Sequence, residues 1–130
     1  MRPNVFNFKL DTIKQNTIES VKIVSGDNKM NLFVLEVEQK EQPFDLTGKL
    51  VMVVFSKTDG TYVSQSSTDL FGFEIEGNVA NVTLAPEVTS TAGRITAEVS
   101  IFGPHEERLT TQKFKFSVRE SILDIIDKNN

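Results

Sequence analysis

The sequence predicts an all-β domain, an antiparallel immunoglobulin-like β-sandwich of about eight or nine strands. Apolar residues recur mostly at every second position in short runs, which is the periodicity of half-buried strands. Glycine, asparagine, aspartate and proline separate these runs at the spacing of sandwich turns. Because cysteine and tryptophan are absent, the antibody-type core built on a Cys–Trp–Cys set is excluded.

The runs with the length and alternation of strands are spread along the whole chain. In order they are Val5–Leu10, Ser20–Ser25, Met30–Glu38, Leu50–Ser56, Thr61–Ser66, Phe73–Glu76, Val79–Leu84, Arg94–Ile101 and Leu109–Val118. The clearest is Arg94–Ile101, where an apolar face alternates with a face of arginine, threonine, glutamate and serine. One face of this strand is therefore predicted to lie in the core and the other in water.

Turn residues predict which of these runs pair as hairpins. Asp59-Gly60 supplies the positive φ of a tight turn between Leu50–Ser56 and the strand that follows it. Gly77-Asn78 does the same for the next pair, and the polar segment Gly103–Arg108 joins the last two runs. The longer segment Ala85–Gly93 is predicted to cross between the sheets.

The end of the chain has a different pattern. Ser121 precedes an apolar group with Asp124 three residues later, which resembles a helix-starting capping box. We therefore divide the chain into a sandwich over residues 1–120 and a segment 121–130. That segment is either the start of a linker helix that leads to another domain or an oligomeric bundle, or a C-terminal cap over an open end of the sandwich.

Composition excludes several classes of function. The chain of 130 residues fits one domain, and its net charge of −4 provides no basic stripe for nucleic acid. The absence of cysteine excludes disulfides, thiolate metal ligands and thiol catalysis. The longest apolar run is Leu50–Phe55, and neither a membrane span nor an export signal is indicated.

No catalytic, metal-binding or cofactor-binding residues are predicted. His105 is the single histidine and lies in a predicted surface turn, without the partners of a catalytic triad. The densest acidic stretch includes Glu36, Glu38, Glu41 and Asp45, but it lacks the spacing of a calcium loop and is interpreted as a solvated strand face. A small hydrolase would need tuned acids that this sequence does not display.

Core and turn positions follow from the same alternation. Glycines 48, 60 and 77 are predicted at turns, where alanine would be disfavoured. The predicted core residues are Val51, Val53, Phe55, Val99, Phe114 and Phe116.

One feature departs from a simple sandwich strand. Leu50–Phe55 is apolar on both faces, and Leu32–Leu35 has the same property, so the two strands are expected to share an outer apolar patch. A partner subunit or the chain's own terminal segments would cover that patch, which indicates an interaction module. The candidate interface residues are Leu50, Met52, Val54, Leu32, Ile122, Ile125 and Ile126.

The motif Gln42-Pro43-Phe44-Asp45-Leu46-Thr47-Gly48 is followed by Ser56-Lys57-Thr58-Asp59-Gly60-Thr61. In order and spacing this pair resembles the N-terminal domain of the baseplate upper proteins of tailed phages that infect Gram-positive bacteria. Further similarity lies in Gly77–Leu84, Ala92–Val99 and Phe114–Ile122, so that the resemblance covers most of the chain from about residue 27.

The resemblance implies a non-enzymatic baseplate component with an immunoglobulin-like fold and no cofactor. Such a domain docks onto the central tail hub, typically the distal tail protein, and a helical linker leads toward the receptor-binding proteins used in host adsorption. The implied location is the virion tail, after production in the cytoplasm of the bacterial host, with copies of the chain meeting in the assembly. No membrane or nucleic-acid partner is implied.

The alternative is a carbohydrate-binding or adhesion sandwich that contacts the host surface directly. Such sites stack sugars on exposed aromatic rings. Tryptophan is absent and Tyr62 is the single tyrosine, so that stacking would fall largely to phenylalanine.

Overall fold

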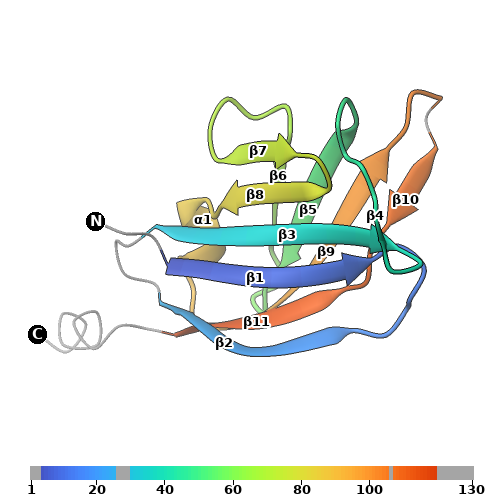
Figure 1. Ribbon diagram of the computed structural model, residues 1–130. Coiled ribbons are helices and arrows are strands. Elements are labelled where there is room, and N and C mark those ends of the chain that lie inside the picture. The colour runs from blue at the N-terminus through green and yellow to red at the C-terminus, as the bar shows by residue number, and fades with distance from the viewer. Residues whose placement is uncertain (1–3, 26–29, 106, 120–130) are drawn as a thin grey trace, which may run out of the picture.

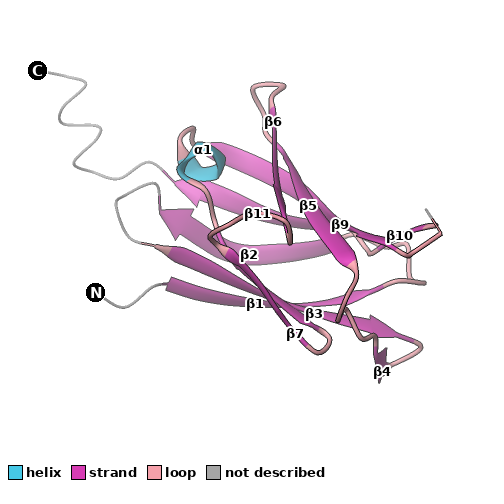
Figure 2. Cartoon of the chain, turned by 90° about the horizontal axis from the view of Figure 1, so that it is seen from above, coloured by secondary structure: helices cyan, strands magenta, loops and turns pink. Residues whose placement is uncertain are grey.

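The computed structural model describes residues 4–25, 30–105 and 107–119. Its elements are β1 (Asn4–Asp11), β2 (Ile18–Ser25), β3 (Asn31–Gln39), β4 (Gln42–Pro43), β5 (Leu50–Ser56), β6 (Tyr62–Ser66), β7 (Phe73–Glu76), β8 (Val79–Thr83), α1 (Pro86–Thr89), β9 (Gly93–Phe102), β10 (Arg108–Thr110) and β11 (Phe114–Arg119). Two sheets face each other, which confirms the predicted all-β sandwich (Figure 1, Figure 2).

The chain passes repeatedly from one sheet to the other. The five-stranded sheet has the order β1-β3-β8-β7 with β4 beside β3, and the six-stranded sheet has the order β2-β11-β9-β5-β6 with β10 beside β9. Most pairs are antiparallel, but β1 pairs with β3 and β2 with β11 in parallel. Parallel pairs need a crossover connection, and β2 supplies one between β1 and β3 because it lies in the opposite sheet. The sheets are therefore mixed.

The predicted hairpins are present. β5 pairs with β6, β7 with β8, and β9 with both β10 and β11. The last predicted strand is divided into β10 and β11, because its register against β9 shifts by one residue between Thr110 and Phe114. The segment from Ala85 to Gly93 crosses between the sheets as predicted, and it contains α1.

Phenylalanine rings from the two sheets meet in the core. Phe8 of β1 and Phe33 of β3 face β11, where the ring centroids lie 4.6 Å apart for Phe8 and Phe114 and 4.8 Å apart for Phe33 and Phe116. Phe55 of β5 makes an edge contact with Phe116 at 6.0 Å. The predicted core residues Val51, Val53, Phe55, Val99, Phe114 and Phe116 are all buried, as expected.

Two buried glutamines join the sheets at their margins. The Gln65 amide of β6 donates to the Thr83 carbonyl and accepts from the Ala85 N–H, each at 2.9 Å. Gln112 accepts from the Asp11 N–H at 3.0 Å and donates to the Asn16 carbonyl at 3.1 Å. Each glutamine side chain hydrogen-bonds to backbone N–H and carbonyl groups that have no partner in a neighbouring strand. Each glutamine therefore holds a loop to the sandwich.

The turns before and after β5 are closed by the same pair of hydrogen bonds, from a threonine to the aspartate two residues before it. The carboxylate of Asp45 accepts hydrogen bonds from the backbone N–H and the hydroxyl of Thr47, and Asp59 accepts the same two from Thr61. These bonds lower the pKa of both aspartates, and the threonine hydroxyl is the largest cause. The predicted turn glycines 48, 60 and 77 have φ values of 75°, 87° and 59°. The two motifs that carry the resemblance are therefore turn-forming motifs.

Replacing Phe114 with alanine should lower the free energy of unfolding by about 3–5 kcal/mol, because its fully buried ring touches both sheets. Urea denaturation measures the loss. Lys113→Ala, at an exposed neighbouring position, should change the value by less than about 0.5 kcal/mol. A loss below about 1 kcal/mol for Phe114→Ala contradicts its role in the core.

Gln65→Leu should cost about 1–3 kcal/mol, because the Ala85 N–H and the Thr83 carbonyl lose their partner. Amide hydrogen exchange should become faster at Ala85 in particular. Ser64→Ala, on the exposed side of the same strand, is the control. Unchanged exchange at Ala85 would argue against this contact.

Thr61→Ala should raise the pKa of Asp59 toward the ordinary aspartate value, while that of Asp45 stays low and serves as internal reference. NMR titration of the carboxyl carbons measures both. The folded-state pKa of each aspartate lies below its unfolded-state value. The stabilisation of the fold by the ionised carboxylate is therefore complete above the unfolded-state pKa. It is lost as the pH falls through the folded-state pKa, so acid should destabilise the parent more than Asp59→Asn. An Asp59 pKa that does not move in Thr61→Ala would disprove the assignment.

Candidate interaction surfaces

The outer face of β5 carries an apolar stripe, which we call the outer stripe and define as Leu50, Met52 and Val54. Their neighbours Val51, Val53 and Phe55 are fully buried, so the two faces of the strand are separated as predicted. Leu50 is 37% exposed, and the other two stripe residues are half-buried. The structure thus brings three of the predicted interface residues onto one surface.

Small polar residues flank the middle of the outer stripe. Met52 lies opposite Ser66 on one side and Ser100 on the other, and Val54 lies between Ser64 and Glu98. Ser66 and Ser100 are themselves buried, and Met52 and Val54 are half-buried. The stripe is therefore only partly accessible from outside, most of all at Leu50.

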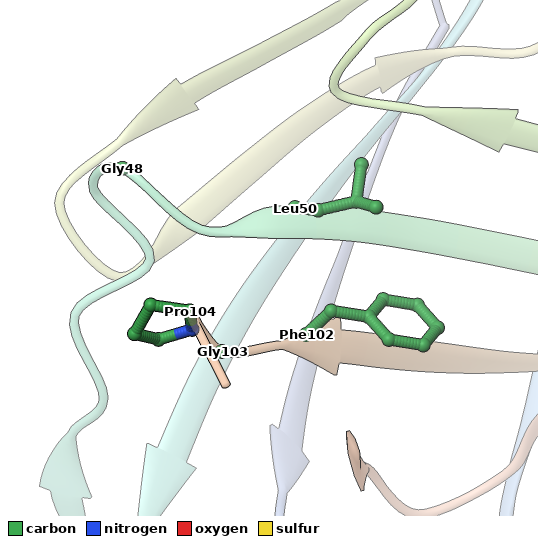
Figure 3. A pocket seen from close by; sticks show the side chains of 5 residues that line it. All are labelled: Gly48, Leu50, Phe102, Gly103 and Pro104. Carbon is green, nitrogen blue, oxygen red and sulfur yellow. The ribbon is translucent and has the colours of Figure 1, made fainter. Parts of the chain in front are cut away.

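An apolar hollow of about 550 Å³ lies at the end of the outer stripe. It is lined by Gly48, Leu50, Phe102, Gly103 and Pro104. Figure 3 shows Leu50 and Phe102 side by side on neighbouring strands, with Pro104 just beyond the end of β9. Sequence reasoning missed Phe102 because the predicted strand ended at Ile101, although its polar-face alternation leads directly to position 102.

A second hollow, of about 460 Å³, lies farther along the same face. Val54 and Tyr62 border it together with the charged side chains of Glu98, Arg108 and Lys113. The guanidinium of Arg108 lies 3.9 Å from the Glu98 carboxylate. The tyrosine ring is 72% exposed, so an apolar surface adjoins a group of charges here.

The remaining interface predictions have a different outcome. Leu32 lies in β3, in the other sheet, where it is half-buried between Val5 and Thr83. The expectation that it shares an outer patch with the β5 residues is wrong, because β3 and β5 belong to different sheets. Ile122, Ile125 and Ile126 lie outside the described residues.

The two outer faces differ in charge. On the five-stranded sheet, register places Lys9, Glu36 and Glu76 on one face, with Glu38 and Glu74 on the same side. On the six-stranded sheet, the face of the outer stripe carries Arg94, Arg108 and Lys115 together with Glu98 and Glu19. One face is therefore mainly acidic, and the other carries both signs with a small excess of basic groups.

Among the described residues, the acidic side chains of these faces and His105 form no group that could hold a metal ion. His105 is exposed in the turn after β9, and its backbone N–H donates to Glu107 at 3.0 Å. Within residues 4–25, 30–105 and 107–119, no three acidic, histidine or cysteine side chains form a group that could hold a metal ion. The same ranges contain no helix long and apolar enough to span a membrane.

Comparison with known proteins identifies the family. The fold is similar to the N-terminal domain of phage TP901-1 ORF48, with a TM-score of 0.69 and 14% identity over 89% of this chain and 98% of that one. A search of curated proteins found no match. The model of the BppU N-terminal domain matches residues 5–130. The chain therefore belongs to this family of N-terminal domains of phage baseplate upper proteins, as the turn motifs suggested.

Proposed function

We propose that the chain is a non-enzymatic adaptor of the phage tail baseplate. It docks onto the central hub, the distal tail protein, and connects the hub to the receptor-binding proteins used in host adsorption. Family membership supports the baseplate setting. The observation that carries the docking step is the outer stripe, of which Leu50 is exposed and Met52 and Val54 are half-buried, on a sheet whose other face is fully packed.

The composition of this face fits a protein partner. Protein interfaces combine an apolar centre with a polar rim, and charged residues are depleted at the centre. The stripe provides the centre, Glu98 lies directly beside Val54, and Arg94, Arg108 and Lys115 stand on the same face. The hub surface that fits this arrangement is apolar at its middle and carries mainly acidic groups at its margin, with a basic group opposite Glu98.

The connection to the receptor-binding proteins is assigned to residues 121–130. Those residues lie outside the described ones, and the support is the helix-start pattern at Ser121 together with the apolar positions Ile122, Ile125 and Ile126. In the proposed adaptor, these isoleucines form the apolar side of the linker.

Direct binding of host saccharide is the second candidate, and exposed Tyr62 beside the hollow that Glu98, Arg108 and Lys113 border favours it. Among the described residues, the other highly exposed aromatic ring is Phe71, which follows the far end of β6. A strand of this length spans roughly 16 Å, so Tyr62 and Phe71 do not form one stacking platform. The adaptor function therefore has the stronger support.

The docking proposal is tested with the distal tail protein encoded in the same tail-gene cluster, by light scattering on a sizing column and by calorimetry. The parent chain should bind in a defined ratio. Val54→Asp should weaken binding by about 30-fold or more, because it places a charge in the apolar centre. Leu32→Asp, on the opposite face, is the matched control and should bind like the parent.

Three outcomes would overturn parts of this proposal. Parent-like binding by Val54→Asp removes the outer stripe from the interface. Loss of binding in Leu32→Asp alone transfers docking to the acidic face. A folded parent chain that does not bind the hub protein refutes the docking role itself.

A further inference from the structure

The turn between β5 and β6 contains the single Asp-Gly bond of the chain, Asp59-Gly60, and the sequence has no Asn-Gly bond. Both residues are exposed, and beyond the chain neighbours no atom lies within 4 Å of the position that a Cβ would take at Gly60. Every other aspartate is followed by a residue whose side chain hinders approach to the next backbone nitrogen. The reaction typical of an Asp-Gly bond is therefore concentrated in this turn.

That reaction rearranges the backbone through a cyclic imide. The Gly60 nitrogen attacks the carboxyl carbon of Asp59, the nitrogen loses its proton, and one carboxyl oxygen leaves as water. Addition of water then opens the imide at either of its two carbonyls. One opening restores aspartate, and the other gives isoaspartate, in which the side-chain methylene has become part of the main chain. The water lost in the first step equals the water gained in the second, so the rearrangement needs no co-reactant.

Hydrogen bonds in the turn engage both of the reacting groups. The Gly60 N–H donates to the Lys57 carbonyl at 3.1 Å, so the nitrogen that would attack is already bonded. The Asp59 carboxylate accepts from the Thr61 N–H at 2.9 Å and from the Thr61 hydroxyl. These bonds lower the pKa of Asp59, with the hydroxyl as the largest cause, and so favour its ionised form. An ionised carboxylate resists attack because it has no oxygen that can leave as water.

The same turn is anchored to the segment that crosses between the sheets. Lys57 is buried, and its ammonium donates to the Glu87 carbonyl at 2.7 Å and to the Ser90 hydroxyl at 3.0 Å. Thr58 lies against Gly93, where a Cβ would lie 2.5 Å from the threonine hydroxyl oxygen. These contacts restrict the main-chain rotations that the attack requires.

We propose that Asp59 is the aspartate of this chain at which the backbone can rearrange to isoaspartate, and that the Thr61 hydroxyl holds the reaction back in the folded domain. Thr61 acts through Asp59 and is therefore a positioning residue. Rearrangement lengthens the main chain of the hairpin by one atom, whereas the Lys57 N–H closes that hairpin on the Thr61 carbonyl at 2.9 Å. Isoaspartate would therefore loosen the adjoining ends of β5 and β6. This proposal rests on the turn alone and is independent of hub docking.

Ageing of the purified chain at one fixed, neutral pH tests the proposal. Peptide mapping measures the rate, because chromatography separates isoaspartate from aspartate and electron-transfer fragmentation identifies it. Thr61→Val keeps the branched side chain but removes the hydroxyl. It should raise the rate at Asp59 about fivefold, the factor that corresponds to one hydrogen bond of typical strength. Thr61→Ser keeps the hydroxyl and should age like the parent.

Two controls separate the effect of the folded turn from that of the local sequence. In denaturant, the parent and Thr61→Val should age at the same rate, and both should age faster than the folded parent. Thr47→Val removes the matching hydroxyl beside Asp45 in the other turn and should leave the rate at Asp59 unchanged.

Three outcomes would contradict the proposal. Equal rates for the folded parent and folded Thr61→Val would refute the role of the hydroxyl. A rate at Asp59 that is as high in the folded parent as in denaturant would show that the turn gives no protection. Faster rearrangement at another aspartate of the denatured chain would overturn the assignment of the site to Asp59.

Discussion

Contacts between phenylalanine rings across the two sheets are the interaction on which the rest of this structure depends. Phe8 and Phe33 on one sheet meet Phe114 and Phe116 on the other, and Phe55 extends the cluster toward β5. Because the inner faces alone supply this packing, the outer residues of β5 are not needed to hold the sheets together. The side chains of Leu50, Met52 and Val54 are therefore free to vary without disturbing this packing, which is consistent with the docking role proposed for them.

Packing of rings holds the centre of the sandwich, and polar contacts hold its margins. Gln65 and Gln112 each bond to backbone groups that no strand pairs, and so they attach loops that would otherwise open to water. The Gln65 contact fixes the chain between β8 and α1 against β6, close to where the Thr83 N–H donates to the Gly72 carbonyl of the loop between β6 and β7. The buried amides thus anchor the neighbouring loops to the sandwich.

Alternation in the sequence predicts which residues share a face of a strand, and it does so correctly for β5, β9 and β11. It does not tell which strands share a sheet, since pairing is decided by contacts between residues far apart in the chain. For this reason Leu32 and Leu50 have the same local pattern but lie in different sheets. Leu70 and Phe71 were missed for a related reason: two apolar residues in a loop have no periodicity, and only their exposure in the folded chain sets them apart.

The turn motifs and the outer faces have separate roles in this domain. Asp45 with Thr47 and Asp59 with Thr61 set the two ends of β5, and thereby fix where the outer stripe and the apolar hollow lie. The fold is similar to that of a solved domain at 14% identity, so one architecture accommodates two largely different sequences. Side chains on the outer faces are among those that the core does not constrain. Local turn geometry and inner packing can therefore preserve the scaffold while the outer side chains vary.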